Sequence, residues 1–192
     1  ERGISATDLL EDAPVRYPKG LGKRRGAWAP ENYDRLYRGP VTVRRALEES
    51  INVPTVRLLE SIGVDAVLEV ARRLGIRSPQ RREYALALGV SEVTLLELTA
   101  AYAALANGGS RVTPHAILRV EGPGGALLEE YRPEVQPALR EEVAYLLTSV
   151  LQGAVERGTG QKAQALGRPA AGKTGTSQEA ADLWFVGYTP DQ

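Results

Sequence analysis

The chain has 192 residues, enough to bury a sizeable hydrophobic core, with 24 basic and 24 acidic residues and no cysteine. The balanced charge gives no general preference for nucleic acid or anionic membranes, and the lack of cysteine excludes a disulfide framework, a thiol nucleophile and thiolate zinc sites. Methionine is absent even at position 1, so we expect a piece of a longer product. No apolar run approaches the roughly 18 residues of a membrane span, so any membrane anchor is expected outside this sequence.

Residues 1–40 are predicted to form an irregular arm. From residue 11 onward the arm is rich in Pro, Gly and scattered aromatic residues and has neither a helical nor an alternating period. Lys23-Arg24-Arg25 is interpreted as a solvated turn between glycines rather than as a basic contact patch.

Residues 41–110 carry a helical pattern. Helices are expected over Thr42–Ser50, Pro54–Gly63 and Asp65–Leu74. Thr94-Leu-Leu-Glu97 is a capping box that opens an apolar helix running to Asn107. Because that helix is apolar on every side, we expect it to be buried nearly all round.

The rest of the chain adds strands. Within residues 111–136, AILRV and ALLEEY flank EGPGG, a pattern that predicts a hairpin. Residues 137–192 are predicted to hold a helix from Arg140 to about Val155 and then two short strands, GRPAAGKTGTS and DLWFVGY, joined by a turn at 177–181. Helices followed by strands indicate an α+β architecture.

The stretch Gly167–Thr174 can be read as a phosphate-binding loop, because it spells G-x-x-x-x-G-K-T. Such a loop needs a buried strand before it and a helix that begins at the Lys-Thr pair, so that amide groups point at the phosphates. KAQALGRPA has no run of Val or Ile, and Gly175 with a polar turn follows Thr174. We therefore disfavour a nucleotide hydrolase and expect no nucleotide ligand.

The same letters also contain K-T-G, at Lys173-Thr174-Gly175, followed by Thr176. On an exposed strand Lys173 and Gly175 face one side and the two threonines the other, unless the strand edge twists. The ammonium and the hydroxyls could bind a carboxylate, and Gly175 suits the close approach of a ligand or another backbone. A plain surface hairpin explains the four letters equally well, so a second motif is needed.

That second motif is Ser50-Ile51-Asn52, an S-x-N at the end of the first clear helix. Alone it is weak, because serine and asparagine are common at helix ends and caps. Its order and spacing relative to Lys173 give it weight.

Several blocks together resemble penicillin-binding proteins, the transpeptidases that cross-link bacterial cell walls, and above all their class A, bifunctional members. The blocks are WAPENYD, GPVTVRRALEESINVPTVRLLESIG, ALALGVSEVTLLELTAAYAALANGG, ERGTGQKA and GKTGTSQEAADLWFVGYTP. The resemblance covers nearly the whole chain. It implies part of the penicillin-binding and serine β-lactamase-like α+β fold, namely a helical subdomain and part of an antiparallel sheet.

The family's nucleophile motif, S-x-x-K, does not occur here, because none of Lys19, Lys23, Lys162 and Lys173 has a serine three positions earlier. Thr159-Gly160-Gln161-Lys162 is the nearest imitation, where the family has a G-T-G loop. The resemblance implies that the nucleophile segment lies shortly before Glu1, with a glycosyltransferase domain and a membrane anchor earlier still. This chain alone is then expected to be inactive.

The resemblance also implies roles for the residues that are present. Ser50 would relay a proton, Asn52 would hold the substrate amide, and Lys173 would supply positive charge. Thr174, Gly175 and Thr176 would bind the terminal carboxylate of a D-Ala-D-Ala stem peptide. The implied partners are peptidoglycan and β-lactams, without nucleic acid, metal or cofactor, at the extracytoplasmic face of the bacterial inner membrane.

Other functions remain open. Without a nucleophile the chain could be a non-catalytic structural piece. A serine β-lactamase or D,D-carboxypeptidase is less favoured, because class A β-lactamases usually carry Asp where this chain has Ile51. His115, near a hairpin, is interpreted as a surface histidine rather than a triad base. Glu48-Glu49 is interpreted as a solvated helix face rather than an acid-base pair.

Overall fold

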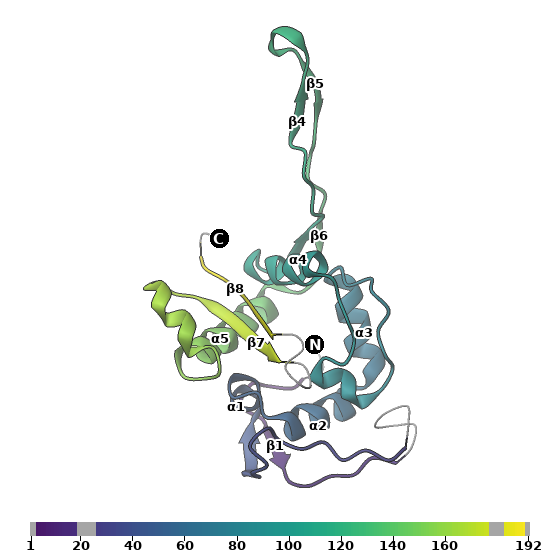
Figure 1. Ribbon diagram of the computed structural model, residues 1–192, viewed down its shortest axis with the longest axis vertical. Coiled ribbons are helices and arrows are strands. Elements are labelled where there is room, and N and C mark those ends of the chain that lie inside the picture. Colours follow the sequence, from purple (N-terminus) through teal and green to yellow (C-terminus); the bar gives the residue numbers. More distant parts are fainter. Residues whose placement is uncertain (1–2, 19–25, 177–182, 191–192) are drawn as a thin grey trace.

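Helices from the first two thirds of the chain lie beside a C-terminal strand pair in the computed structural model, which describes residues 3–18, 26–176 and 183–190 (Figure 1). The strands form four two-stranded antiparallel sheets within these ranges: β1 with β2, β3 with β6, β4 with β5, and β7 with β8. The α+β architecture predicted from the sequence is confirmed.

The N-terminal arm contains one strand and the start of a second, so the prediction of an irregular arm was wrong there. β1 (Leu9–Asp12) pairs with β2 (Gly39–Thr42), and Leu10 lies opposite Val41. Leu10 packs against a small core that contains Val41, which is why these residues pair. Between the strands Tyr17 and Trp28 exchange backbone hydrogen bonds of 2.7 and 2.9 Å. Lys23-Arg24-Arg25 lies outside the described residues.

The predicted helices are present as α1 (Val43–Glu48), α2 (Asn52–Ile62), α3 (Val64–Arg73) and α4 (Leu95–Ala106), with a 3-10 turn η1 (Tyr84–Leu88). Helix α2 begins at Asn52 and not at Pro54. Pro54 is tolerated inside the first turn because backbone N–H groups there need no partner within the helix.

Helix α4 has the predicted capping box, in which Thr94 and Glu97 each bind the other's backbone N–H. The expectation that it is buried nearly all round was wrong, since Leu95 and Leu96 are 64% and 63% exposed. Its buried residues, such as Ala101 and Leu105, form one face that packs toward β3, β8 and α5.

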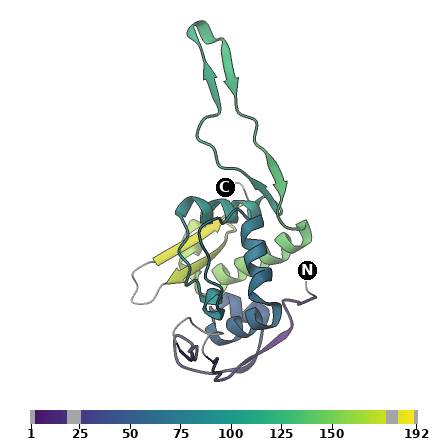
Figure 2. The same ribbon diagram turned by 90° about the vertical axis from the view of Figure 1, so that its right-hand side faces the viewer.

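A long hairpin projects away from the rest of the molecule (Figures 1 and 2). Its base is β3 (Ser110–Val112) with β6 (Val135–Pro137), and its outer part is β4 (Arg119–Glu121) and β5 (Leu127–Glu130), joined through η2 (Pro123–Gly125). The hairpin predicted around EGPGG is therefore confirmed.

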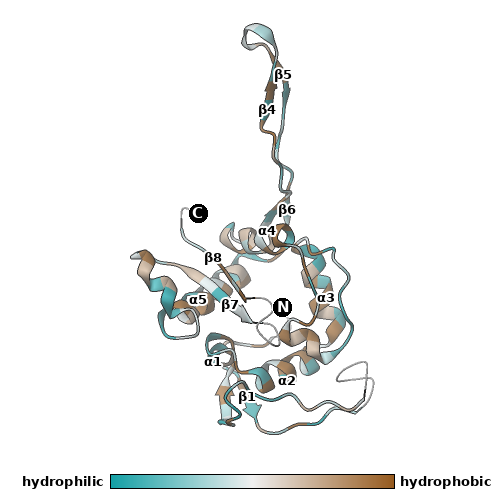
Figure 3. Cartoon of the chain, viewed as in Figure 1, coloured by the Kyte–Doolittle hydropathy of each residue, from teal (hydrophilic) through white to brown (hydrophobic). Residues whose placement is uncertain are grey.

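The C-terminal part consists of α5 (Glu141–Glu156), η3 (Gln161–Leu166), β7 (Ala171–Thr176) and β8 (Leu183–Tyr188). Figure 3 shows hydrophobic residues along β8 and in α5. Leu105, Leu151 and Ala171 join α4, α5 and β7 in one core cluster. The helix and the two strands were predicted, whereas the predicted turn at 177–181 lies outside the described residues. No helix in the described ranges has the length and apolar character that a membrane crossing needs.

Candidate active site

The turn between α1 and α2 presents the two polar residues of the S-x-N motif. Ile51, its middle residue, is buried with Val41 and Ala46. Ser50 has a φ of 55°, a left-handed conformation that is uncommon for a residue with a side chain. Burial of Ile51 therefore anchors the turn, and the strained backbone at Ser50 marks it as a position to examine for function.

Strand β7 brings Lys173 to this turn from the other end of the chain. The Lys173 ammonium donates a short hydrogen bond to the Ser50 hydroxyl, although 123 positions separate the two residues. The adjacent Gly172 is required by packing, because a Cβ there would lie 2.6 Å from Phe185 Cζ and 2.9 Å from the Val186 carbonyl oxygen. The structure thus joins the two motifs that the sequence singled out.

The ammonium of Lys173 is surrounded by neutral oxygens. Its Nζ lies 3.0 Å from the Thr174 carbonyl oxygen, 3.4 Å from Thr174 Oγ1 and 3.5 Å from Thr159 Oγ1. No carboxylate in the described part of the chain is within ion-pair distance of it. Burial lowers the pKa of Lys173. A cation without an acidic partner can attract an anionic ligand or stabilise developing negative charge.

Threonine hydroxyls lie beside the ammonium. Thr174 Oγ1 and Thr159 Oγ1 are 2.6 Å apart and share a hydrogen bond. Gly175 and Thr176 are exposed at the end of β7. A Cβ on Gly175 would meet only Trp184 Cβ, at 3.9 Å, so packing within the described chain does not require glycine there. Its use for the close approach of a ligand remains a prediction.

Asn52 is held by the N-terminal arm and not by Lys173. Its Nδ2 donates to the Glu31 carbonyl oxygen at 2.9 Å. The neighbouring Asn32 accepts a 3.0 Å hydrogen bond from the backbone N–H of Val53, near the start of α2. The WAPENYD block therefore fixes the asparagine end of the motif. The structure brings Ser50, Lys173 and Thr174 into direct contact and leaves Asn52 at the edge of that group.

Two residues near the site, Glu48 and Thr159, were not predicted from the sequence to belong to it. Glu48 was interpreted as solvated, but it is only 5% exposed and forms an ion pair with Arg157. Thr159 was noted only as an imitation of another motif, yet it contacts both Thr174 and Lys173. The block ERGTGQKA was a signal for Thr159, but nothing in the local pattern around Glu48 pointed to a partner 109 positions away.

Comparison with known proteins decides what this arrangement belongs to. The sequence profile described as "Penicillin binding protein transpeptidase domain" matches residues 16–192. The chain belongs to the penicillin-binding protein transpeptidase family. It is 39% identical over 197 residues to penicillin-binding protein 1A of Neisseria cinerea and 34% identical over 213 residues to that of Rickettsia felis, covering 99% of this chain in both cases.

Solved structures agree with this assignment. Penicillin-binding protein 1A from Haemophilus influenzae superposes with a TM-score of 0.89 at 26% identity, covering 97% of this chain and 33% of that one. The imipenem acyl-enzyme complex of penicillin-binding protein A from M. tuberculosis gives a TM-score of 0.81 at 27% identity, covering 98% and 47%. The chain spans about a quarter of the length of the curated relatives, 25% and 27%. These residues form part of a penicillin-binding transpeptidase domain.

Other candidate sites in this transpeptidase domain lead to no competing chemistry. His115 stacks on Tyr131 with ring centroids 3.8 Å apart, on the projecting hairpin. Lys173 and Thr174 lie in a strand and not at a helix start, so the geometry of a phosphate-binding loop is absent there. In the described ranges, no group of three His, Asp or Glu side chains is arranged to hold a metal ion.

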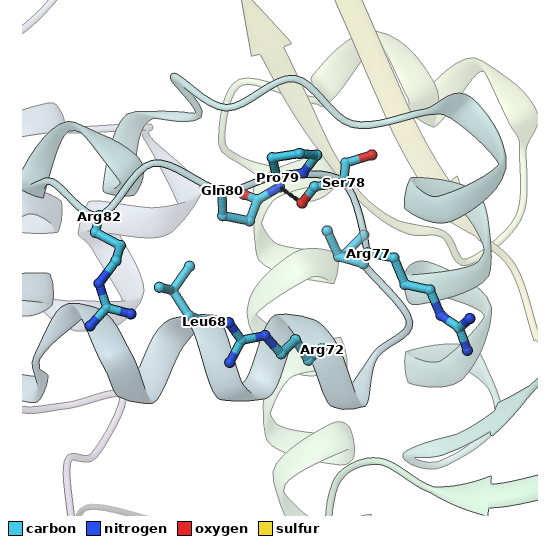
Figure 4. Close-up of a pocket in the computed structure, with 8 residues that line it drawn as sticks. Leu68, Arg72, Arg77, Ser78, Pro79, Gln80 and Arg82 are labelled. Carbon is cyan, nitrogen blue, oxygen red and sulfur yellow. Dashed lines mark hydrogen bonds between the residues drawn. The ribbon is translucent and has the colours of Figure 1, made fainter.

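A hollow lies beside α3, and none of Ser50, Asn52 and Lys173 lines it (Figure 4). Its volume is about 450 Å³, and it is lined by Leu68, Arg72, Ile76, Arg77, Ser78, Pro79, Gln80 and Arg82. The Ser78 hydroxyl donates to Glu97, and Arg77 extends away from the other two arginines (Figure 4). The hydrogen bonds that Glu97 accepts lower its pKa to about 2, which makes this carboxylate a weak base for activating Ser78. Ser50 with Lys173 therefore remains the candidate active site.

Proposed function

We propose that these residues supply the S-x-N and K-T-G walls of the active site of a peptidoglycan D,D-transpeptidase. The observation that carries the proposal is the hydrogen bond from Lys173 to Ser50, which joins the two motifs across 123 positions. An ammonium that contacts a serine hydroxyl, with threonine hydroxyls beside it, suits proton transfer next to a bound carboxylate. Membership in the family supports the reaction class.

In this mechanism a serine outside the 192 residues is the nucleophile. None of the four lysines has a serine three positions before it, so we infer that a preceding segment of the full-length protein carries S-x-x-K. The serine oxygen attacks the carbonyl of the penultimate D-Ala, and the C–N bond breaks to release D-Ala. An amine of a neighbouring stem peptide then takes the acyl group, and serine regains its proton.

Each residue of the site has a step to perform. Ser50 passes a proton from the nucleophile toward the leaving amine, while the Lys173 charge holds Ser50 in its acceptor role and attracts the substrate carboxylate. Thr174 and Thr176 donate hydrogen bonds to that carboxylate, and the exposed backbone at Gly175 admits the peptide. Asn52 binds the substrate amide. Because the chemistry joins wall precursors, we assign the protein to the extracytoplasmic face of the bacterial inner membrane.

β-Lactams provide the test. The M. tuberculosis relative forms an acyl-enzyme with imipenem, so the full-length protein is expected to be acylated by a fluorescent penicillin. Lys173→Ala should slow acylation by about 10² to 10³, the scale for losing one preorganised charge. Lys162→Ala, at an exposed position in η3, is the control and should leave the rate unchanged. An unaltered rate in Lys173→Ala would remove Lys173 from the mechanism, and failure to label the unmutated full-length protein would overturn the proposed function.

A further inference from the structure

A buried carboxylate lies two positions before Ser50. Glu48 is 5% exposed, and Arg157 binds both of its oxygens, Nε to Oε2 at 2.8 Å and Nη2 to Oε1 at 2.5 Å. Arg44, one turn earlier in α1, lies 3.3 Å from Oε1. A two-pronged guanidinium–carboxylate pair fixes orientation as well as distance. The pair therefore ties the end of α1 to the segment that follows α5.

The backbones of the two segments also touch. The Glu48 carbonyl oxygen accepts a 3.1 Å hydrogen bond from the N–H of Thr159. A Cβ on Gly158 would lie 2.1 Å from that same oxygen, and a Cβ on Gly153 would lie 2.0 Å from Glu48 Oε1. At position 158 the clash is with backbone, so glycine is required there. At position 153 a Cβ would instead displace the ends of the Glu48 and Arg157 side chains and so disturb the ion pair. The contact is a close fit that the sequence builds at four positions.

The result of this fit is the location of the Thr159 side chain. Its hydroxyl lies 2.6 Å from that of Thr174 and 3.5 Å from the Lys173 ammonium, and it is exposed. When two hydroxyls share one hydrogen bond, one hydrogen lies between the oxygens and the other can be donated to a third group. Because the Lys173 ammonium lies beside these two hydroxyls, a ligand bound there could contact both a hydrogen-bond donor and a positive charge.

We propose that Thr159 contributes a third hydroxyl to the group that binds the substrate carboxylate, and that the Glu48–Arg157 ion pair is the positioning device that holds it there. This rests on the proposed function, because it assumes that the ligand at Lys173 ends in a carboxylate. Glu48 and Arg157 do not touch the substrate. They act by holding Thr159 against Thr174.

The first experiment compares a penicillin with its methyl ester, using the full-length protein. In Thr159→Val the acylation rate with the free carboxylate should fall about 10- to 100-fold, the effect of losing a hydrogen bond to a charged group. The rate with the ester should change little, because the ester lacks the charge. Thr159→Ser should restore the preference for the carboxylate. Equal loss with both compounds, or no loss with either, would overturn the role of Thr159.

The second experiment tests the positioning device. Glu48→Gln and Arg157→Gln should each reduce the preference for the free carboxylate about 2- to 10-fold. When either is combined with Thr159→Val, the loss should be smaller than the sum of the two separate losses, because all three residues act through the Thr159 hydroxyl. If Glu48→Gln fails to fold, Arg157→Lys serves instead, because it keeps the charge at a half-exposed position and loses only the fork. Full additivity with Thr159→Val would show that the ion pair is merely structural.

The failure of this inference can be told apart from that of the proposed function. A full-length protein that is not acylated by any penicillin contradicts both. A protein that is acylated, and in which Thr159→Val keeps the preference of the unmutated protein for the free carboxylate, contradicts the inference alone. Arg45→Gln, on the outer side of the same helix, should leave the preference unchanged and controls for altered charge near the site.

Discussion

Two attachments hold the Ser50–Asn52 turn, one from each side, and they differ in chemistry. On the side of the arm, Asn32 Nδ2 donates to Asp12 Oδ1 and to the Leu36 carbonyl oxygen, both at 2.7 Å, while its Oδ1 accepts from the N–H of Val53. Asn32 and Asp12 are 4% and 0% exposed. On the other side stands the Glu48–Arg157 ion pair, in which the Arg157 side chain is 54% exposed.

The difference separates stability from function. The network around Asn32 joins two buried side chains and supplies the acceptor for the buried N–H of Val53, so its loss should act on the folded state. The ion pair has one solvent-exposed partner, and water screens such a pair. Thr159 lies on the same side of the turn as the ion pair, and its hydroxyl contacts the Lys173 ammonium. We therefore expect the first attachment to determine whether the turn forms and the second to determine how the site is arranged.

The largest effect on stability is expected for Asn32→Ala. The substitution leaves Asp12 Oδ1 and the Val53 N–H buried without this partner, and each such loss costs about 1 to 3 kcal/mol. Thermal and urea unfolding of the full-length protein should show a clear loss, larger than that for Arg157→Gln. Tyr33→Ala, the neighbouring residue and 97% exposed, is the control. Equal losses in Asn32→Ala and Arg157→Gln would remove the distinction between the two attachments.

The features that could be predicted from the sequence are those that depend on residues close together in the chain. Helix boundaries and the capping box of α4 depend on local patterns, and they were predicted to within two or three residues. The meeting of Ser50 with Lys173 was inferred only through resemblance to a family, because no local rule joins residues 123 positions apart. The pairing of β1 with β2 was missed, since each strand is only four residues long.

Glu48 illustrates why the rest of the site could not be predicted from the sequence. Two adjacent glutamates on a short helix look alike in sequence, yet Glu48 is buried and Glu49 is exposed. What distinguishes them is the side of α1 that faces α5 and the glycines at 153 and 158 that let the backbone approach. Those glycines lie more than a hundred positions away. Tertiary contact, and not local preference, decides which of the two carboxylates is held.

At the surface of the molecule, the Glu97 carboxylate binds backbone N–H groups. Glu97 accepts from the N–H groups of Arg77 and Ser78 at 2.9 and 3.0 Å and from the Ser78 hydroxyl at 2.5 Å. The Ser78 hydroxyl, with these backbone donors, lowers the pKa of Glu97 from 4.5 to about 2. Because the pKa is lowered by folding, its stabilisation is present above about pH 4.5 and is lost as the pH falls toward 2.

Glu97→Gln should therefore lower the melting temperature by a few degrees at pH 7, a smaller loss than that of Asn32→Ala because the site is exposed to water. The difference between the variant and the unmutated protein should shrink as the pH falls from about 4.5 to 2, where the native carboxylate takes up its proton. Melting curves across this range, with the exposed Glu92→Gln as control, measure the effect. A difference that does not change with pH would mean that the charge of Glu97 contributes nothing.

The smallest effect is expected for the ion pair that neighbours Glu48–Arg157 on the outer side of α1. Arg45 Nε lies 2.8 Å from Glu49 Oε1, but the two side chains are 52% and 37% exposed. Pairs of this kind, four residues apart on a helix surface, contribute about 0.3 to 0.5 kcal/mol and weaken with salt. Arg45→Gln should lower the free energy of unfolding by no more than this in low salt, and by less in high salt, with penicillin acylation unchanged. A loss of acylation in Arg45→Gln comparable to that in Arg157→Gln would mean that charge anywhere on α1 affects the site. The effect assigned to Glu48–Arg157 would then not depend on the fit between Glu48 and the glycines at 153 and 158.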